Sequence, residues 1–76
     1  MNPRICDVMA LVLDVPVTEI QDGFSAETVG TWDSIHHLNL VMALEEAFGV
    51  SFSSSEIAGL QSYRAIEQAL AARRVV

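Results

Sequence analysis

The stretch from Ser34 to Phe48, SIHHLNLVMALEEAF, holds more apolar residues than one buried helix face can accommodate. Its apolar residues recur every three or four positions, which predicts an α-helix. The stripe expected to face the core is Leu40, Val41, Leu44, Ala47 and Phe48. Because each residue advances about 100° around a helix axis, Ile35, Leu38 and Met42 fall almost opposite that stripe. The fold therefore either covers this second face with another helix or leaves it exposed for a partner.

The chain before this helix predicts one further long helix and a long loop. Pro3 suits a first helical turn, and the residues at helical spacing after it are Ile5, Val8, Met9, Val12 and Leu13. Pro16 closes this helix, and TEIQDGFSAETVGTWD follows. Loops of this length are uncommon in compact domains unless their own apolar side chains pack them down. The residues expected to pin this loop are Ile20, Phe24, Val29 and Trp32.

The chain after the central helix predicts a short helix and a last long one. Gly49 is a stop signal, and Ser53 with Glu56 forms a capping box for a helix from Ser54 to about Ala58. Ser62 is expected to cap a last helix whose inward residues are Tyr63, Ile66, Ala69 and Leu70. The sequence thus predicts an all-α fold, a small four-helix bundle with three longer helices, one short helix and a long first loop, as a single domain over residues 1–76.

Charge and cysteine content narrow the possible partners. The net charge is −6, there is no lysine, and the cationic side chains are Arg4, Arg64, Arg73 and Arg74. A phosphate-binding surface is therefore missing, so neither nucleic acid nor an anionic membrane is expected as a partner, whereas a basic protein surface is. Cys6 is the only cysteine and cannot form an internal disulfide, which favours a reducing, cytoplasmic location. Its side chain is expected to be a half-buried hydrophobe. Asp7 and Asp14 interrupt the apolar opening, so it is not expected to span a membrane.

Ser34 stands at the first turn of the central helix, directly after Asp33. In the simplest interpretation one of these two residues is the N-cap. A second interpretation starts from electrostatics, because free amides and the helix dipole favour an anion at this place, such as a phosphodiester on the Ser34 hydroxyl. The face formed by Ile35, Leu38 and Met42, framed by Glu45 and Glu46, would then be the surface to which a partner binds.

The motif Asp33-Ser34-Ile35, followed by LVMALEEAFGVSF, resembles the acyl carrier protein family, whose mark is a serine in an Asp-Ser-Leu motif at the start of the second helix. The resemblance runs from about Ile5 to Leu70 and includes the acidic ALEE, the FGV stop and the long first loop. It implies that Ser34 bears 4′-phosphopantetheine, which a phosphopantetheinyl transferase moves from coenzyme A. Acyl groups would be held as thioesters on the terminal thiol, and the chain itself would catalyse nothing.

The sequence also departs from many carriers of fatty acid synthesis, because it has His36 and Asn39 where those have acidic residues. This favours a carrier for a specialised pathway, such as polyketide or related secondary-metabolite assembly. The alternatives are an amino-acyl or peptidyl carrier, a carrier of primary fatty acid synthesis, and a helical adaptor without a cofactor. The expected partners are the transferase and acyl-transferring, ketosynthase or ligase-type enzymes that offer an apolar groove with a basic rim, and the protein is expected to be a monomer.

His36 and His37 invite an enzymatic or metal-binding interpretation. A nucleophilic serine needs a base, an orienting group and an oxyanion site, and a metal ion needs three or four converging ligands. The sequence nominates too few groups, so neither catalytic residues nor a metal site is expected. His37 falls toward the core stripe and should be packed and hydrogen-bonded, whereas His36 should lie at a solvated edge.

Overall fold

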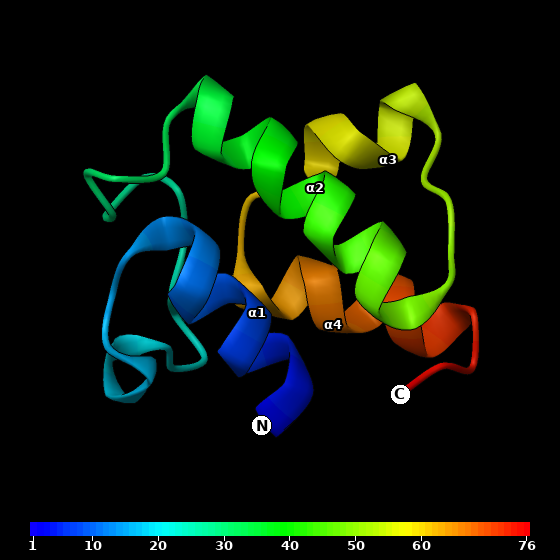
Figure 1. Cartoon of the computed structure of the whole chain (residues 1–76), viewed down its shortest axis with the longest axis horizontal. Coiled ribbons are helices and arrows are strands. Elements are labelled where there is room, and N and C mark those ends of the chain that lie inside the picture. Colours follow the sequence, from blue (N-terminus) through cyan, green and yellow to red (C-terminus); the bar gives the residue numbers. More distant parts are fainter.

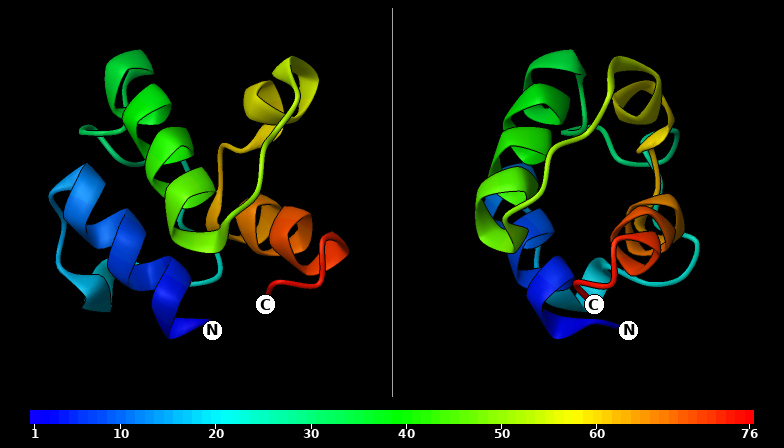
Figure 2. Two further views of the ribbon diagram at one scale, coloured as in Figure 1. Left: turned by 45° about the vertical axis from the view of Figure 1, so that its right-hand side comes forward. Right: turned by 90° about the vertical axis from the view of Figure 1, so that its right-hand side faces the viewer.

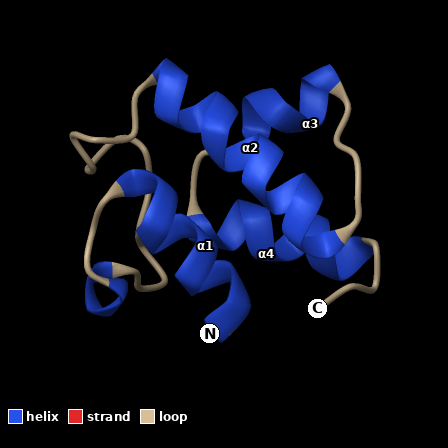
Figure 3. Cartoon of the chain, in the orientation of Figure 1, coloured by secondary structure: helices blue, strands red, loops and turns tan.

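The computed structural model describes all 76 residues, and all of its regular elements are helices (Figures 1 and 3). Its elements are α1 (Pro3–Leu13), the 3₁₀ turn η1 (Val17–Glu19), α2 (Ser34–Phe48), α3 (Ser54–Gly59) and α4 (Tyr63–Ala72). α1 lies beside α2 on one side of the molecule, with α3 and α4 on the other (Figure 2). The predicted bundle of three longer helices and one short helix, with a long first loop, is confirmed. Every helix falls short of the length and hydrophobicity that a bilayer-spanning segment needs.

Local capping signals set the start of α1 and the C-terminal end of α2. The Asn2 side chain accepts hydrogen bonds from the backbone amides of Arg4 and Ile5, which satisfies two of the amides that a helix start leaves free. α2 ends at Phe48 and is followed by Gly49, whose φ of 66° lies in the left-handed region that glycine adopts without steric cost. Its amide bonds back to the carbonyl oxygen of Glu45. The predicted bounds of this helix are therefore confirmed.

The two later helices also begin at predicted caps. Ser53 and Glu56 form the predicted capping box of α3, in which each side chain accepts from the other residue's amide. α3 runs to Gly59, one residue beyond the expected end. The Ser62 side chain accepts from the amide of Ala65 and so caps α4.

The core is one cluster of sixteen buried side chains drawn from the long helices, the first loop and the segments that flank α3. Three of the four predicted loop pins, Ile20, Phe24 and Trp32, are buried in it, and Val29 packs against it while partly exposed. In α4, Tyr63, Ile66 and Leu70 are buried and Ala69 is partly so. The loop is thus fixed to the bundle by its own apolar residues, as its length requires.

Two predicted helix faces need correction. In α1 the buried residues are Ile5, Cys6, Met9 and Leu13, while Val8 and Val12 are only partly buried. The contact face of this helix is therefore turned toward Cys6, which is buried and not half-buried as predicted. In α2 the predicted core residue Ala47 is exposed. It lies in the last turn, where Arg4 of α1 reaches only its carbonyl oxygen, at 2.9 Å, and places its guanidinium over the Phe48 ring.

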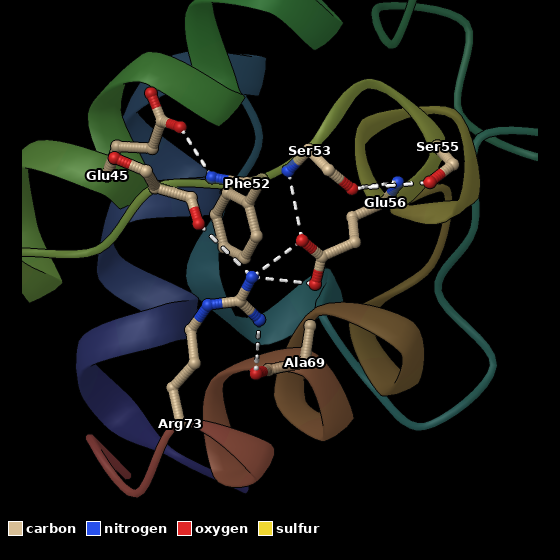
Figure 4. Close-up of polar contacts among 8 residues, drawn as sticks. Glu45, Phe52, Ser53, Ser55, Glu56, Ala69 and Arg73 are labelled. Atoms are coloured by element: carbon tan, nitrogen blue, oxygen red, sulfur yellow. Dashed lines mark hydrogen bonds and ion pairs between the residues drawn. The ribbon is translucent and has the colours of Figure 1, made fainter.

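Arg73 ties the end of α4 to the start of α3 (Figure 4). Its guanidinium donates to both carboxylate oxygens of Glu56, at 2.6 and 2.7 Å, and to the carbonyl oxygens of Ala69 and Ser51. It also lies over the Phe52 ring, 4.6 Å from the ring centre. The hydrogen bonds from Arg73 to the Glu56 carboxylate, together with the bond from the Ser53 amide, lower the pKa of Glu56 to about 2.

Candidate functional site

Ser34 is the first residue of α2 and is exposed. Asp33 is the N-cap, since its carboxylate accepts the backbone amide of His36 at 2.9 Å. The choice that the sequence left open between the two residues is thereby settled, and the Ser34 hydroxyl is not needed to cap the helix. The pKa of Asp33 is lowered, chiefly by that amide and next by the His36 ring, whose Nδ1 lies 2.8 Å from the carboxylate.

His37 bridges three elements. Trp32 Nε1, which can only donate, bonds to His37 Nδ1 at 3.0 Å, so His37 Nε2 carries the ring proton and donates to the Ile57 carbonyl oxygen at 2.8 Å. The indole and imidazole rings are stacked, with centroids 6.2 Å apart. The prediction that His37 is packed and hydrogen-bonded is confirmed. Because both ring nitrogens are engaged, His37 has no free nitrogen with which to deprotonate Ser34.

A hollow of about 360 Å³ opens beside Ser34. It is lined by Ala26, Trp32, Asp33, Ser34, His37, Leu38 and Gln61. Ala26 and Gln61 come together because the first loop pairs with the segment before α4: the Ala26 amide donates to the Gln61 carbonyl at 2.9 Å, beside an isolated bridge between Ser25 and Ser62. Neither residue was predicted from the sequence, since no periodicity or motif signals a backbone contact between a loop and a distant linker.

The face formed by Ile35, Leu38 and Met42 is not covered by another helix. The exposed fractions of these side chains are 68%, 57% and 64%. Glu46 is exposed at the far end of α2, but Glu45 is half-buried, and its carboxylate accepts the Phe52 amide at 2.8 Å. Of the two glutamates expected to frame the face, Glu45 is therefore largely occupied in fixing the segment after α2.

Other polar groups near Ser34 are few. The His36 ring is partly exposed, at 38%, and its only polar contacts are with Asp33. No three histidine, cysteine or acidic side chains lie close enough together to hold a metal ion. The site therefore consists of an accessible hydroxyl at a helix start, a hollow beside it, and an apolar face whose Leu38 also lines the hollow.

A family model described as phosphopantetheine attachment site matches residues 3–70. The match takes in α1, α2 and α3 completely and α4 as far as Leu70. Ser34, the hollow and the exposed face all lie within it. No curated protein matches the chain.

Proposed function

The chain belongs to the family of phosphopantetheine-attachment domains, and on that premise we propose that Ser34 is the residue to which the 4′-phosphopantetheine arm is joined. Membership makes the chain a carrier protein whose cofactor is covalent 4′-phosphopantetheine, and whose partners are a phosphopantetheinyl transferase and acyl-handling enzymes. When bound, the arm supplies a terminal thiol that holds acyl groups as thioesters. The observation that carries the proposal is the exposed Ser34 hydroxyl at the first turn of α2.

The surroundings of Ser34 suit a phosphodiester. The amides of a first helical turn and the helix dipole attract negative charge, and α2 with its fifteen residues has a well-formed dipole. The nearest carboxylate, that of Asp33, accepts the His36 amide and contacts the His36 ring. An exposed hydroxyl that caps nothing is also free to react without loss of a structural bond.

We further propose that the face formed by Ile35, Leu38 and Met42 is the docking surface for the partner enzymes. Contiguous exposed hydrophobic residues commonly mark interaction sites. These three lie within about 2.2 turns of Ser34 on the same helix, so a partner that covers them brings its own active site close to the arm. Glu46 and the net charge of −6 favour a partner with a basic rim.

For the pathway, we propose specialised acyl assembly of the polyketide or a related secondary-metabolite type. His36 and Asn39 support this, because they leave the first turns of the docking helix less acidic than in many carriers of fatty acid synthesis. The check is a competition assay in which this carrier and a fatty-acid carrier are offered to a fatty-acid ketosynthase. This chain should be the poorer substrate, and equal use of both would assign it to primary fatty acid synthesis. Preferential loading by an amino-acid-activating ligase would instead make it an amino-acyl carrier.

The attachment residue is tested by intact mass after incubation with coenzyme A, Mg²⁺ and a broad-specificity phosphopantetheinyl transferase. The wild type should gain one phosphopantetheine group and Ser34→Ala none. Because Ser34 is exposed and is not the cap, its replacement should change the free energy of unfolding by no more than about 0.5 kcal/mol.

Ser54→Ala is the matched control, because Ser54 is likewise the exposed first residue of a helix and follows the capping residue of α3. This variant should be modified like the wild type. If Ser34→Ala were still modified, or if the folded wild type gained no mass beside a modified control carrier, the proposed attachment would be wrong.

A further inference from the structure

The hollow beside Ser34 is closed off from the core of the bundle. Of the sixteen core residues only Trp32 lines it. The core itself is filled by side chains with almost no exposure, such as Leu40, Leu44 and Ile66. The hollow is therefore a surface recess with a definite floor, and not the mouth of a channel between the helices.

Hydrogen bonds hold its inner wall in place. His37 accepts from the Trp32 indole and donates to the Ile57 carbonyl, and so joins the first loop, α2 and α3 beside the hollow. Trp32 is only 6% exposed and is backed by Phe24, with ring centroids 5.9 Å apart. A group that enters the hollow meets a fixed aromatic wall, because movement of either ring would break the bond that both share.

The volume and lining set the kind of group that fits. About 360 Å³ is near the lower end of the roughly 300–1,000 Å³ typical of ligand pockets, and a cavity of about 150 Å³ already holds a benzene ring. Trp32, Leu38 and Ala26 offer apolar contact. Gln61 donates its side-chain NH₂ to the Ala58 carbonyl, so its own side-chain carbonyl can accept from an amide. This combination suits a short acyl or single-ring group at the end of an amide-containing arm.

We propose that the hollow seats the cargo outside the helical core, with His37 as the residue that keeps it there, so that the chain favours compact cargo, a short acyl group or one aromatic ring, over a long saturated chain. This proposal rests on the proposed attachment at Ser34. Ser34 lines the hollow itself, so the tether starts at its rim. His37 acts as a specificity-determining wall and has no chemical step to perform.

The test loads the protein with acyl-phosphopantetheine from benzoyl-, butyryl- and dodecanoyl-coenzyme A, and intact mass confirms each product. Trp32 is the only tryptophan and lines the hollow, so tryptophan fluorescence reports on the surroundings of this one ring. Benzoyl and butyryl cargo should shift or quench this emission relative to the holo protein. Dodecanoyl cargo should leave Tm unchanged, because a chain that stays in water adds no buried contact to the folded state.

His37→Ala removes the wall, and His36→Ala is its matched control, since the adjacent ring is partly exposed and contacts only Asp33. His37→Ala should lose the emission change with compact cargo and gain Tm with the dodecanoyl group, whereas His36→Ala should behave as the wild type. His37→Gln keeps one donor and one acceptor and should restore the wild-type pattern. This variant still tests the proposal if circular dichroism shows that His37→Ala does not fold.

Two results would overturn the proposal. One is a rise in wild-type Tm with dodecanoyl cargo, and the other is Trp32 emission that does not change with benzoyl or butyryl cargo in protein whose intact mass confirms the loading. A failure of the attachment at Ser34 is recognised separately, because the mass increment would then be absent or would persist in Ser34→Ala. In that case the hollow would have no tethered occupant and this proposal would fall with the first.

Discussion

Two neighbouring histidines on α2 show how one step around a helix decides what a side chain does. The His37 ring is half-buried and uses both nitrogens, whereas the His36 ring is partly exposed and contacts only Asp33. The 100° rotation per residue was enough to predict this difference from the sequence. The rotation per residue could not identify the hydrogen-bond partners Trp32 and Ile57, because the positions of these residues depend on the path of the first loop and on the placement of α3.

Glu56 is the single carboxylate on which we expect acid stability to depend most clearly. Its pKa falls from the usual value near 4.5 to about 2, chiefly because Arg73 donates to it. A lowered pKa means that the ionised form favours the folded state, so the contribution is complete above pH 4.5 and is lost as the pH falls toward about 2. Denaturant unfolding at a series of pH values should show Glu56→Gln to be less stable than the wild type at pH 7, with the difference vanishing in acid.

The matched control for this prediction is Glu46→Gln. Glu46 is exposed, so removing its charge should leave the free energy of unfolding nearly unchanged at every pH. An identical pH profile for the wild type and Glu56→Gln would show that the contact between Glu56 and Arg73 does not stabilise the fold.

At the scale of an element, α3 differs from the other helices because none of its residues is buried. Its position is fixed by flanking core residues, by its capping box and by polar bonds to its neighbours, from His37 to the Ile57 carbonyl and from Arg73 to Glu56. The sequence predicted where α3 begins, because the capping box is a local pattern. It could not predict these cross-links or the turn η1, which depend on where distant segments return.

For α2 we expect Met42→Glu to impair two reactions, the transfer of phosphopantetheine from coenzyme A and the transfer of acyl groups by an acyl-handling enzyme. The reason is that the substitution places a charge in the proposed docking surface. kcat/KM for the partner enzymes should fall by about tenfold, the equivalent of about 1.4 kcal/mol of lost binding. The free energy of unfolding should change little, because Met42 is 64% exposed.

Leu11→Glu serves as the control for that measurement. Leu11 is 84% exposed and lies on α1, not on the helix that carries the proposed docking surface, so the same change in hydrophobicity and charge should leave partner kinetics near the wild-type values. Equal loss of activity in both variants would indicate a general effect of added negative charge and would remove support for the α2 surface.

Tyr63 joins the start of the chain to the last helix, across most of the length of the sequence. Its side chain is fully buried, and its hydroxyl accepts from the Asn2 amide and donates to the Glu67 carboxylate, each at 2.7 Å. Burial and the Glu67 bond raise the pKa of Tyr63 from about 10 to about 12. The neutral phenol therefore favours the folded state, a contribution that is complete below pH 10 and is lost as the pH rises through 12.

Because Tyr63 is the only tyrosine, its ionisation can be followed directly by ultraviolet absorbance. The transition in the folded protein should be centred near pH 12, and Glu67→Gln should move it downward by removing the negative partner. A midpoint near 10 in protein that circular dichroism shows to be folded would contradict the buried position of the hydroxyl.

Most of the architecture was accessible from the sequence, because caps, stops and apolar spacing are local properties of Ser53, Gly49 and the α2 stripe. The family resemblance carried by Asp33-Ser34-Ile35 was also visible there. The hollow was not, since it forms only where Ala26 and Gln61 meet across a backbone bridge. The orientation of α1 was misjudged because its contact face is set by its neighbours as well as by its own periodicity.

The buried position of Cys6 has a chemical consequence for a protein that carries thioesters. A thioester is lost when a thiolate or an amine attacks it, and only the ionised thiol is strongly nucleophilic. Cys6 is 6% exposed, and burial raises its pKa. Apart from His36 and His37, the basic side chains are the four arginines, so these 76 residues contain no side-chain amine. The scaffold therefore offers neither a reactive thiolate nor a lysine amine to which a tethered acyl group could be transferred.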